Sequence, residues 1–132
     1  MANVKISPPF EWTHAGASKL LEYYEHLFET QAVDEILSAF TEDVHVDYSG
    51  TDPFVGRDKL RGLLKTRFAK LKDYRLKKKV EFLSDSKIAA SWKSEWIDIP
   101  TRRRMRGAGV EVLTREGQLY THWVASFHGW QI

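Results

Sequence analysis

Three side chains of this sequence have the chemistry needed for proton transfer on a carbonyl compound. Tyr24 and Tyr48 carry phenolic hydroxyl groups, which can donate to an oxygen atom as it gains negative charge. His122 carries an imidazole, and histidine as a residue type titrates close to neutral pH, so it is the candidate general base. These residues predict an acid/base site if the fold brings them into one pocket.

Each of these residues also has a purely structural explanation. Tyr24 matches a core tyrosine on an amphipathic helix, with its hydroxyl group satisfied inside the protein. Tyr48 and the tryptophans Trp92 and Trp96 are residue types that strands favour for packing alone. His122 fits a structural or interface role as well as it fits catalysis, and the sequence leaves these alternatives open.

Length and composition restrict the kind of protein. The chain has 132 residues, 42% hydrophobic and 29% charged, and we expect one domain over residues 1–132. Its 20 basic and 18 acidic side chains leave a formal net charge of +2, too small for the whole molecule to attract nucleic acid. No apolar signal segment or run of roughly 18 apolar residues is present. We therefore expect a cytoplasmic protein that binds neither nucleic acid nor a membrane.

The sequence also argues against a metal or a cofactor. It contains no cysteine, which excludes disulfides, thiolate metal sites and cysteine nucleophiles. No spacing of histidine, aspartate and glutamate resembles a helical HExxH motif or a facial triad. We expect a small molecule as the ligand, no metal site and no cofactor.

Two basic segments form a separate feature. Lysines and arginines gather at 70–79 and again at 101–106. They fit an anionic ligand such as a carboxylate, phosphate or thioester of coenzyme A, or an RNA surface. They equally fit a solvated face balanced by Glu81, Glu95 and Asp98.

Helical periodicity dominates the first half of the chain. Apolar residues recur at the spacing of one helix face over 13–30, 32–40 and 58–71, with Thr13 and Asp58 as candidate N-caps. The rest alternates with the period of a strand, which predicts strands at 44–48, 76–82, 88–97, 105–114 and 119–128. Lys78 is the exception on the otherwise apolar face of the 76–82 strand. Helices followed by an antiparallel meander predict an α+β fold, with three N-terminal helices packed on a strongly curved sheet.

Local motifs agree with this order of elements. The stretch Phe40-Thr-Glu-Asp-Val-His-Val-Asp-Tyr48 and the later Val55-Gly-Arg-Asp58 resemble the recurring signature of the NTF2-like superfamily. The segment from Trp123 to Trp130 resembles the closing strand of its SnoaL-like members. The resemblance implies a cone-shaped NTF2-like (cystatin-like) fold around one pocket. It specifies chemistry poorly, because the superfamily contains isomerases, dehydratases, cyclases, hydrolases and non-catalytic binders.

Two templates from this superfamily point to different residues. Alignment with ketosteroid isomerase places the oxyanion-donating tyrosine on Tyr24, whereas the aspartate base falls on Tyr48. Its second oxyanion carboxylic acid falls near 109–111, where Glu111 is the only acid. Alignment with scytalone dehydratase instead carries a strand tyrosine onto Tyr48 and replaces a helix tyrosine with Phe28. Limonene epoxide hydrolase chemistry is disfavoured, because Val124 and Ala125 stand where that family has an aspartate.

The expected pocket depends on which face of the last strand is concave. If the face with His122 is concave, the pocket also contains Phe28, Trp92, Trp96, Glu111 and Val124. The alternative face is more apolar and competes for the same role; it carries Thr121, Trp123, Ala125 and Phe127. The sequence does not decide between the two faces.

Two functional hypotheses follow. The first is a cofactor-independent isomerase, cyclase or dehydratase acting on a small apolar carbonyl compound. The second is a non-catalytic module that binds a small molecule or a protein, suggested by the missing family carboxylates. For either one we expect a homodimer, because Trp123 and Phe127 would be available on an outer sheet face for two copies to bury.

Overall fold

The structure is a computed structural model that describes residues 9–132. Its helices are α1 (His14–Glu29), α2 (Val33–Leu37) and α3 (Arg57–Phe68). Its strands are β1 (Phe40–Tyr48), β2 (Phe54–Val55), β3 (Leu71–Leu83), β4 (Lys87–Asp98), β5 (Arg104–Glu116) and β6 (Leu119–Gln131). The predicted α+β class with three N-terminal helices is confirmed.

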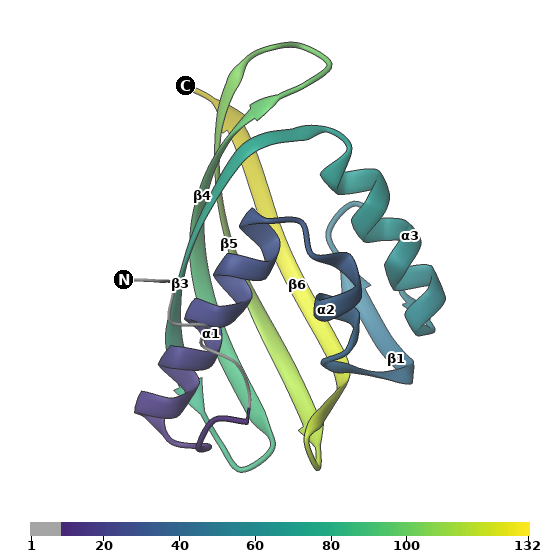
Figure 1. The fold of residues 1–132 in the computed structure, drawn as a ribbon, viewed down its shortest axis with the longest axis vertical. Coiled ribbons are helices and arrows are strands. Elements are labelled where there is room, and N and C mark those ends of the chain that lie inside the picture. Colours follow the sequence, from purple (N-terminus) through teal and green to yellow (C-terminus); the bar gives the residue numbers. More distant parts are fainter. Residues whose placement is uncertain (1–8) are drawn as a thin grey trace.

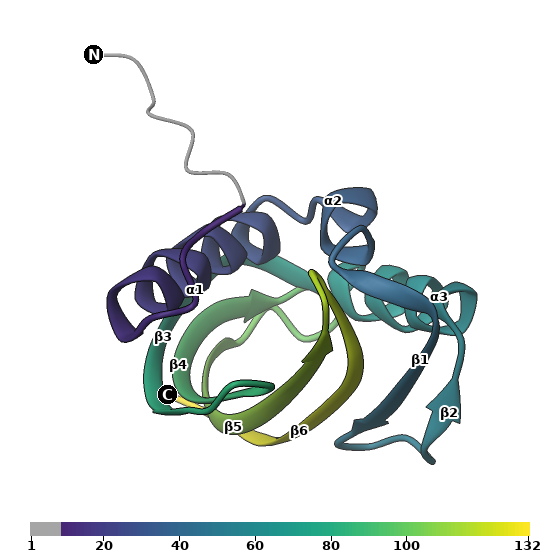
Figure 2. The same ribbon diagram turned by 90° about the horizontal axis from the view of Figure 1, so that it is seen from below.

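One sheet contains all six strands in the order β2-β1-β6-β5-β4-β3. The long strands β3 to β6 form an antiparallel meander, and β1 joins it by pairing parallel to β6. Figure 1 shows the helices on one side of this sheet, and Figure 2 shows the meander curling beneath α1. The inner face of the curl and the apolar faces of the helices form the core.

Of the two predicted N-caps, the structure confirms one. The Thr13 hydroxyl accepts a hydrogen bond from the Gly16 backbone N–H at 3.0 Å, which confirms the predicted N-cap of α1. The predicted Asp58 cap is wrong, because α3 begins at Arg57 and its N-cap is Gly56, with φ of 119°. Asp58 lies in the first turn instead, where its charge suits the helix dipole.

Helix α1 covers the exposed edge of the sheet at β3. The carboxylates of Glu25 and Glu29 accept hydrogen bonds from the backbone N–H groups of Lys78 and Leu76, at 2.7 and 2.8 Å. These N–H groups belong to an edge strand and have no sheet partner on that side. The two glutamates are four residues apart on one helix face, which is about 6 Å along the helix. The two N–H groups are two residues apart on one strand edge, which is nearly the same distance, about 6.6 Å.

Strand β3 departs from the predicted face at its end. Leu76, Val80 and the side chain of Lys78 are buried, but Phe82 is 63% exposed. The pairing of β3 with β4 shifts register between Val80 and Phe82, and such a shift turns the following side chain to the other face.

None of the helices within residues 9–132 is long and apolar enough to cross a lipid bilayer.

Glycines on the inner face make room for the tryptophans of β4. A Cβ atom on Gly109 would lie 2.5 Å from the Trp92 ring and 2.7 Å from the Cβ of Phe127. A Cβ atom on Gly107 would lie 3.0 Å from Trp96. The large rings therefore lie across backbone that carries no side chain.

This packing makes Gly109→Ala destabilising. We expect a loss of about 1–3 kcal/mol in the free energy of unfolding, because the Trp92 ring and Phe127 must both move. Gly62→Ala in α3 is the matched control, since no atom lies within 4 Å of its added Cβ and alanine is the better helix former. Urea unfolding should show the control at or above wild-type stability; equal effects of the two changes would contradict this packing.

Candidate functional site

The inner face of β6 is the apolar one. Trp123 and Ala125 are only 4% and 3% exposed, whereas Val124 is 48% exposed on the opposite face. A bulge at Thr121 separates this run from Tyr120: Thr114 pairs with His122, and Arg115 with Tyr120. Tyr120 is therefore buried on the inner side.

His122 consequently does not meet the tyrosines with which it was expected to converge. Its side chain is exposed on the outer face, where its ring stacks on that of His45 with centroids 4.8 Å apart. The Thr121 hydroxyl lies 2.9 Å from its Nδ1 atom. Val124 lies beside it in a shallow outer groove, not in the interior pocket for which it was predicted.

Two tyrosines form a hydroxyl pair inside the cone. Tyr24 of α1 donates a hydrogen bond to the Tyr120 hydroxyl at 3.0 Å, and their rings meet edge to face. Burial is the main cause that raises the pKa of Tyr24 well above its ordinary value and that of Tyr120 to about 12. The Glu111 carboxylate contributes in the same direction to both. Both phenols therefore remain neutral donors at physiological pH.

A buried ion pair lies behind these tyrosines. The Lys78 ammonium group contacts the Glu111 carboxylate, and their side chains are 5% and 1% exposed. The other carboxylate oxygen of Glu111 accepts a hydrogen bond from the Trp123 indole at 2.9 Å. Aromatic rings enclose the ammonium, with the centroids of Trp92 and Phe28 at 5.2 and 5.5 Å. Phe28, Trp92 and Glu111 thus all contribute to the interior, on the face of the sheet opposite to His122.

Such a pair needs a reason beyond stability. Removing two charges from water costs several kcal/mol per ion, and a well-packed apolar pair is often as stable. Here the Trp123 indole hydrogen-bonds the carboxylate, and the rings of Phe28 and Trp92 face the ammonium group. A lysine and a glutamate in these surroundings form a candidate acid/base centre.

Two hollows meet at the tyrosine pair. An inner cavity of about 20 Å³ is lined by Lys78, Glu111, Phe28 and Trp123, together with both tyrosines. On the other side is the aromatic hollow, of about 450 Å³, whose walls include Phe10, Trp12, Tyr23, Tyr24 and Tyr120. Tyr24 and Tyr120 line both spaces, so they stand between the hollow and the ion pair.

The remaining predicted site residues lie further along the cone. Tyr48 packs edge to face against Trp123 and Phe127, lines neither hollow, and has its pKa raised to about 12 chiefly by burial. Trp96 packs against Tyr74, with ring centroids 6.1 Å apart. The structure therefore brings Tyr24 together with Glu111 and Phe28, but not with Tyr48 or Trp96.

Three residues of the site were not among the predicted site residues. Lys78 had a signal, since it is the one charged residue on an apolar strand face. Trp123 belongs to the competing face of β6, and Tyr120 reaches the interior only because of the bulge. Within residues 9–132, no three histidine, aspartate or glutamate side chains gather in a way that could hold a metal ion.

Known structures share this architecture. SalBIII, an epoxide hydrolase/cyclase-like enzyme of pyran ring formation in the polyether salinomycin, matches with a TM-score of 0.70 at 19% identity over 83% of this chain and 88% of its own. An NTF2-like protein of unknown function from Burkholderia pseudomallei matches with 0.72 at 14% identity, over 82% and 87%. A protein with a ketosteroid isomerase-like fold from Catenulispora acidiphila, in complex with trimethylamine, matches with 0.69 at 8% identity, over 81% and 83%.

These likenesses, at low identity, show that the chain has the NTF2-like fold. Comparison with curated proteins finds no match. The chain belongs to the family described as "Protein of unknown function (DUF1348)", which matches residues 8–128.

Breaking the ion pair from one side should be costly. Lys78→Met leaves the Glu111 charge buried without compensation, so we expect a loss of about 3–5 kcal/mol in the free energy of unfolding. The double variant Lys78→Met/Glu111→Gln should recover most of it, because the amide is neutral and its oxygen can still accept from Trp123. Urea unfolding of the single and double variants measures the coupling; additive losses would contradict a buried pair.

Buried tyrosines should make the fold sensitive to alkali. A tyrosine whose pKa is raised from 10.0 to about 12 contributes to the free energy of unfolding, and this contribution is fully present below pH 10. It is lost as the pH rises toward 12, because the tyrosine ionises more readily in the unfolded chain than in the folded one. We expect a fall of roughly 2–3 kcal/mol per such tyrosine over this window. Tyr48→Phe should make the fall in unfolding free energy shallower, whereas Tyr23→Phe, at a half-buried position, should change it less. Identical slopes for wild type and Tyr48→Phe would count against this.

Proposed function

We propose that this protein is a cofactor-independent acid/base catalyst acting on a small, largely apolar carbonyl compound, as an isomerase, cyclase or dehydratase. The observation that carries the proposal is the buried Lys78–Glu111 pair behind the Tyr24–Tyr120 hydroxyl pair. Donors and a carboxylate thus lie within one aromatic interior. The structurally similar SalBIII is described as an epoxide hydrolase/cyclase-like enzyme, which is compatible with the proposed class.

In the proposed mechanism, the substrate enters from the aromatic hollow and its carbonyl oxygen accepts a hydrogen bond from Tyr120. Tyr24 donates to the Tyr120 oxygen, which leaves the Tyr120 proton for the substrate. As negative charge develops on the carbonyl oxygen, this donor stabilises it. The pair acts while neutral, consistent with the raised pKa of both phenols.

Glu111 is the proposed base in place of His122. It takes the proton from the carbon next to the carbonyl group and returns it elsewhere on the substrate or to the leaving group. Lys78 compensates the charge of the carboxylate before the transfer, because its ammonium group contacts one carboxylate oxygen. Because aromatic rings exclude water around the pair, each of these interactions is stronger than in solution.

A second candidate is a non-catalytic module that binds its ligand in the aromatic hollow. The size of the inner cavity favours it: about 20 Å³ holds about one water molecule and no substrate. A ligand would then stop at the tyrosine pair and never contact Glu111. Both candidates use the same hollow and differ in whether a proton is transferred.

Deuterium exchange separates the two candidates without knowledge of the natural substrate. Small cyclic ketones incubated with the protein in D2O should lose their α-proton signals in the NMR spectrum faster than without it. We expect Glu111→Gln and Tyr120→Phe each to slow this exchange about 100-fold or more. His122→Ala, on the outer face, is the control and should keep the rate.

The alternative outcomes are distinct. A ketone that binds, as seen by saturation-transfer NMR, but exchanges no faster than in buffer supports the non-catalytic module. Exchange that survives Glu111→Gln but is lost in His122→Ala would overturn the assignment of the base. Circular dichroism of each variant checks that its fold is retained.

A further inference from the structure

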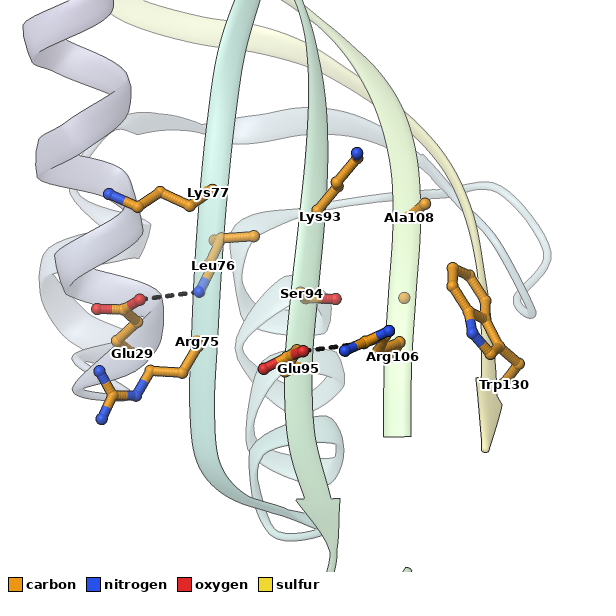
Figure 3. Close-up of a pocket in the computed structure, with 11 residues that line it drawn as sticks. Glu29, Arg75, Leu76, Lys77, Lys93, Ser94, Glu95, Arg106, Ala108 and Trp130 are labelled. Atoms are coloured by element: carbon orange, nitrogen blue, oxygen red, sulfur yellow. Dashed lines mark hydrogen bonds and ion pairs between the residues drawn. The ribbon is translucent and has the colours of Figure 1, made fainter. Parts of the chain in front are cut away.

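The outer face of the sheet carries a second large hollow, on the side opposite the ion pair. Its volume is about 830 Å³, and we call it the basic trough; around it lie the cations Arg75, Lys77, Lys93 and Arg106, the carboxylates of Glu29 and Glu95, and Trp130. Apart from Glu29 of α1, these residues lie on β3, β4, β5 and β6 and alternate with inward-facing ones; Lys77 points outward and Lys78 inward. Figure 3 shows Arg75 and Lys77 along β3 and Trp130 on the far side, beyond β5.

The cations of the basic trough are poorly balanced. Lys77 lies directly opposite Lys93 in the pairing of β3 with β4, and like charges in that position destabilise a sheet. Arg106 pairs with Glu95 at 2.9 Å. Among the ion pairs of residues 9–132, none includes Arg75, Lys77 or Lys93. Glu29 and Glu95 also line the hollow, and Glu95 lies directly opposite Arg75. The cations still outnumber the carboxylates, and Lys77 and Lys93 face each other without an ion-pair partner among residues 9–132.

The opposite end of the trough is aromatic. Trp130 is 42% exposed, and the ring of His128 covers part of it with centroids 5.2 Å apart. Three strand spacings of about 4.8 Å each separate β3 from β6, so Trp130 is about 14 Å across the sheet from Arg75, the β3 residue in register with it. The floor between them is low, because Ala108 is small and the neighbouring Ser94 and Gly107 face the inner side of the sheet. A ligand that reaches both ends must be elongated, with an anionic end and a flat ring.

We propose that the basic trough binds a nucleoside diphosphate. Its phosphates contact Lys77, Lys93 and Arg75, and its base stacks on Trp130. The volume lies within the range of small-molecule pockets. A single aromatic residue at one end of the cations fits one base better than a nucleic-acid strand, which would need aromatic residues interleaved with the charges. This site is independent of the proposed catalytic function, because the sheet separates the two.

Titration calorimetry with ADP tests the proposal. We expect saturable binding that weakens as salt is raised, because ions screen exposed charges. Lys93→Gln and Lys77→Gln should each weaken ADP binding about 10-fold, since each removes a charged contact to phosphate. Lys59→Gln, an exposed lysine on α3, is the matched control and should leave the affinity unchanged. The neutral variants relieve the Lys77–Lys93 repulsion, so both should melt no lower than wild type.

Inorganic pyrophosphate separates the two ends of the site. Trp130→Leu should weaken ADP binding about 10-fold but leave pyrophosphate binding unchanged, because only the base stacks on the indole. The proposal is overturned if neither ADP nor pyrophosphate binds saturably at millimolar concentration, or if Lys59→Gln weakens binding as much as Lys93→Gln. It is also overturned if a single-stranded RNA displaces ADP and binds more tightly, or if sedimentation shows a dimer whose formation abolishes ADP binding.

Discussion

The interior of this protein depends on the ion pair between Lys78 and Glu111. Two enclosed charges are tolerated only where their remaining bonding capacity is satisfied. The Trp123 indole supplies a donor to the carboxylate, and the rings of Phe28 and Trp92 face the ammonium. These groups come from α1, β4 and β6, and the pair itself comes from β3 and β5, so the requirements of one pair determine how a helix and four strands meet.

Helix α1 positions the same pair from the β3 edge of the sheet. Glu25 holds the backbone N–H of Lys78, which fixes the strand edge that carries the lysine. Tyr24 precedes Glu25, and the anchored helix therefore brings its hydroxyl group to Tyr120. One helix thus closes the sheet edge, encloses the ion pair and provides a donor at the boundary of the aromatic hollow.

Much of the fold follows from local pattern. Periodicity predicted the order of helices and strands and the α+β class. The residue preference of helix starts predicted the cap at Thr13. Both signals depend only on residues that are close together in the sequence. Tyr24 was placed on the inner side by the same helical spacing. Lys78 stood out as a charge on an apolar strand face, although its partner Glu111 lies 33 residues away and only pairing of β3 with β4 and β5 brings them together. The single domain and the homodimer stay predictions.

The sequence by itself determined the elements and their residue types, whereas only the tertiary structure decided which face of β6 is inside. The bulge at Thr121 turns Tyr120 inward and leaves His122 outside, and one inserted residue reverses the parity of every position beyond it. The bulge depends on how β6 pairs with β1 and β5. The pattern of residues within β6 does not contain this pairing, so the bulge could not be predicted from it. For that reason the proposed base is the buried carboxylate of Glu111 and not the imidazole of His122.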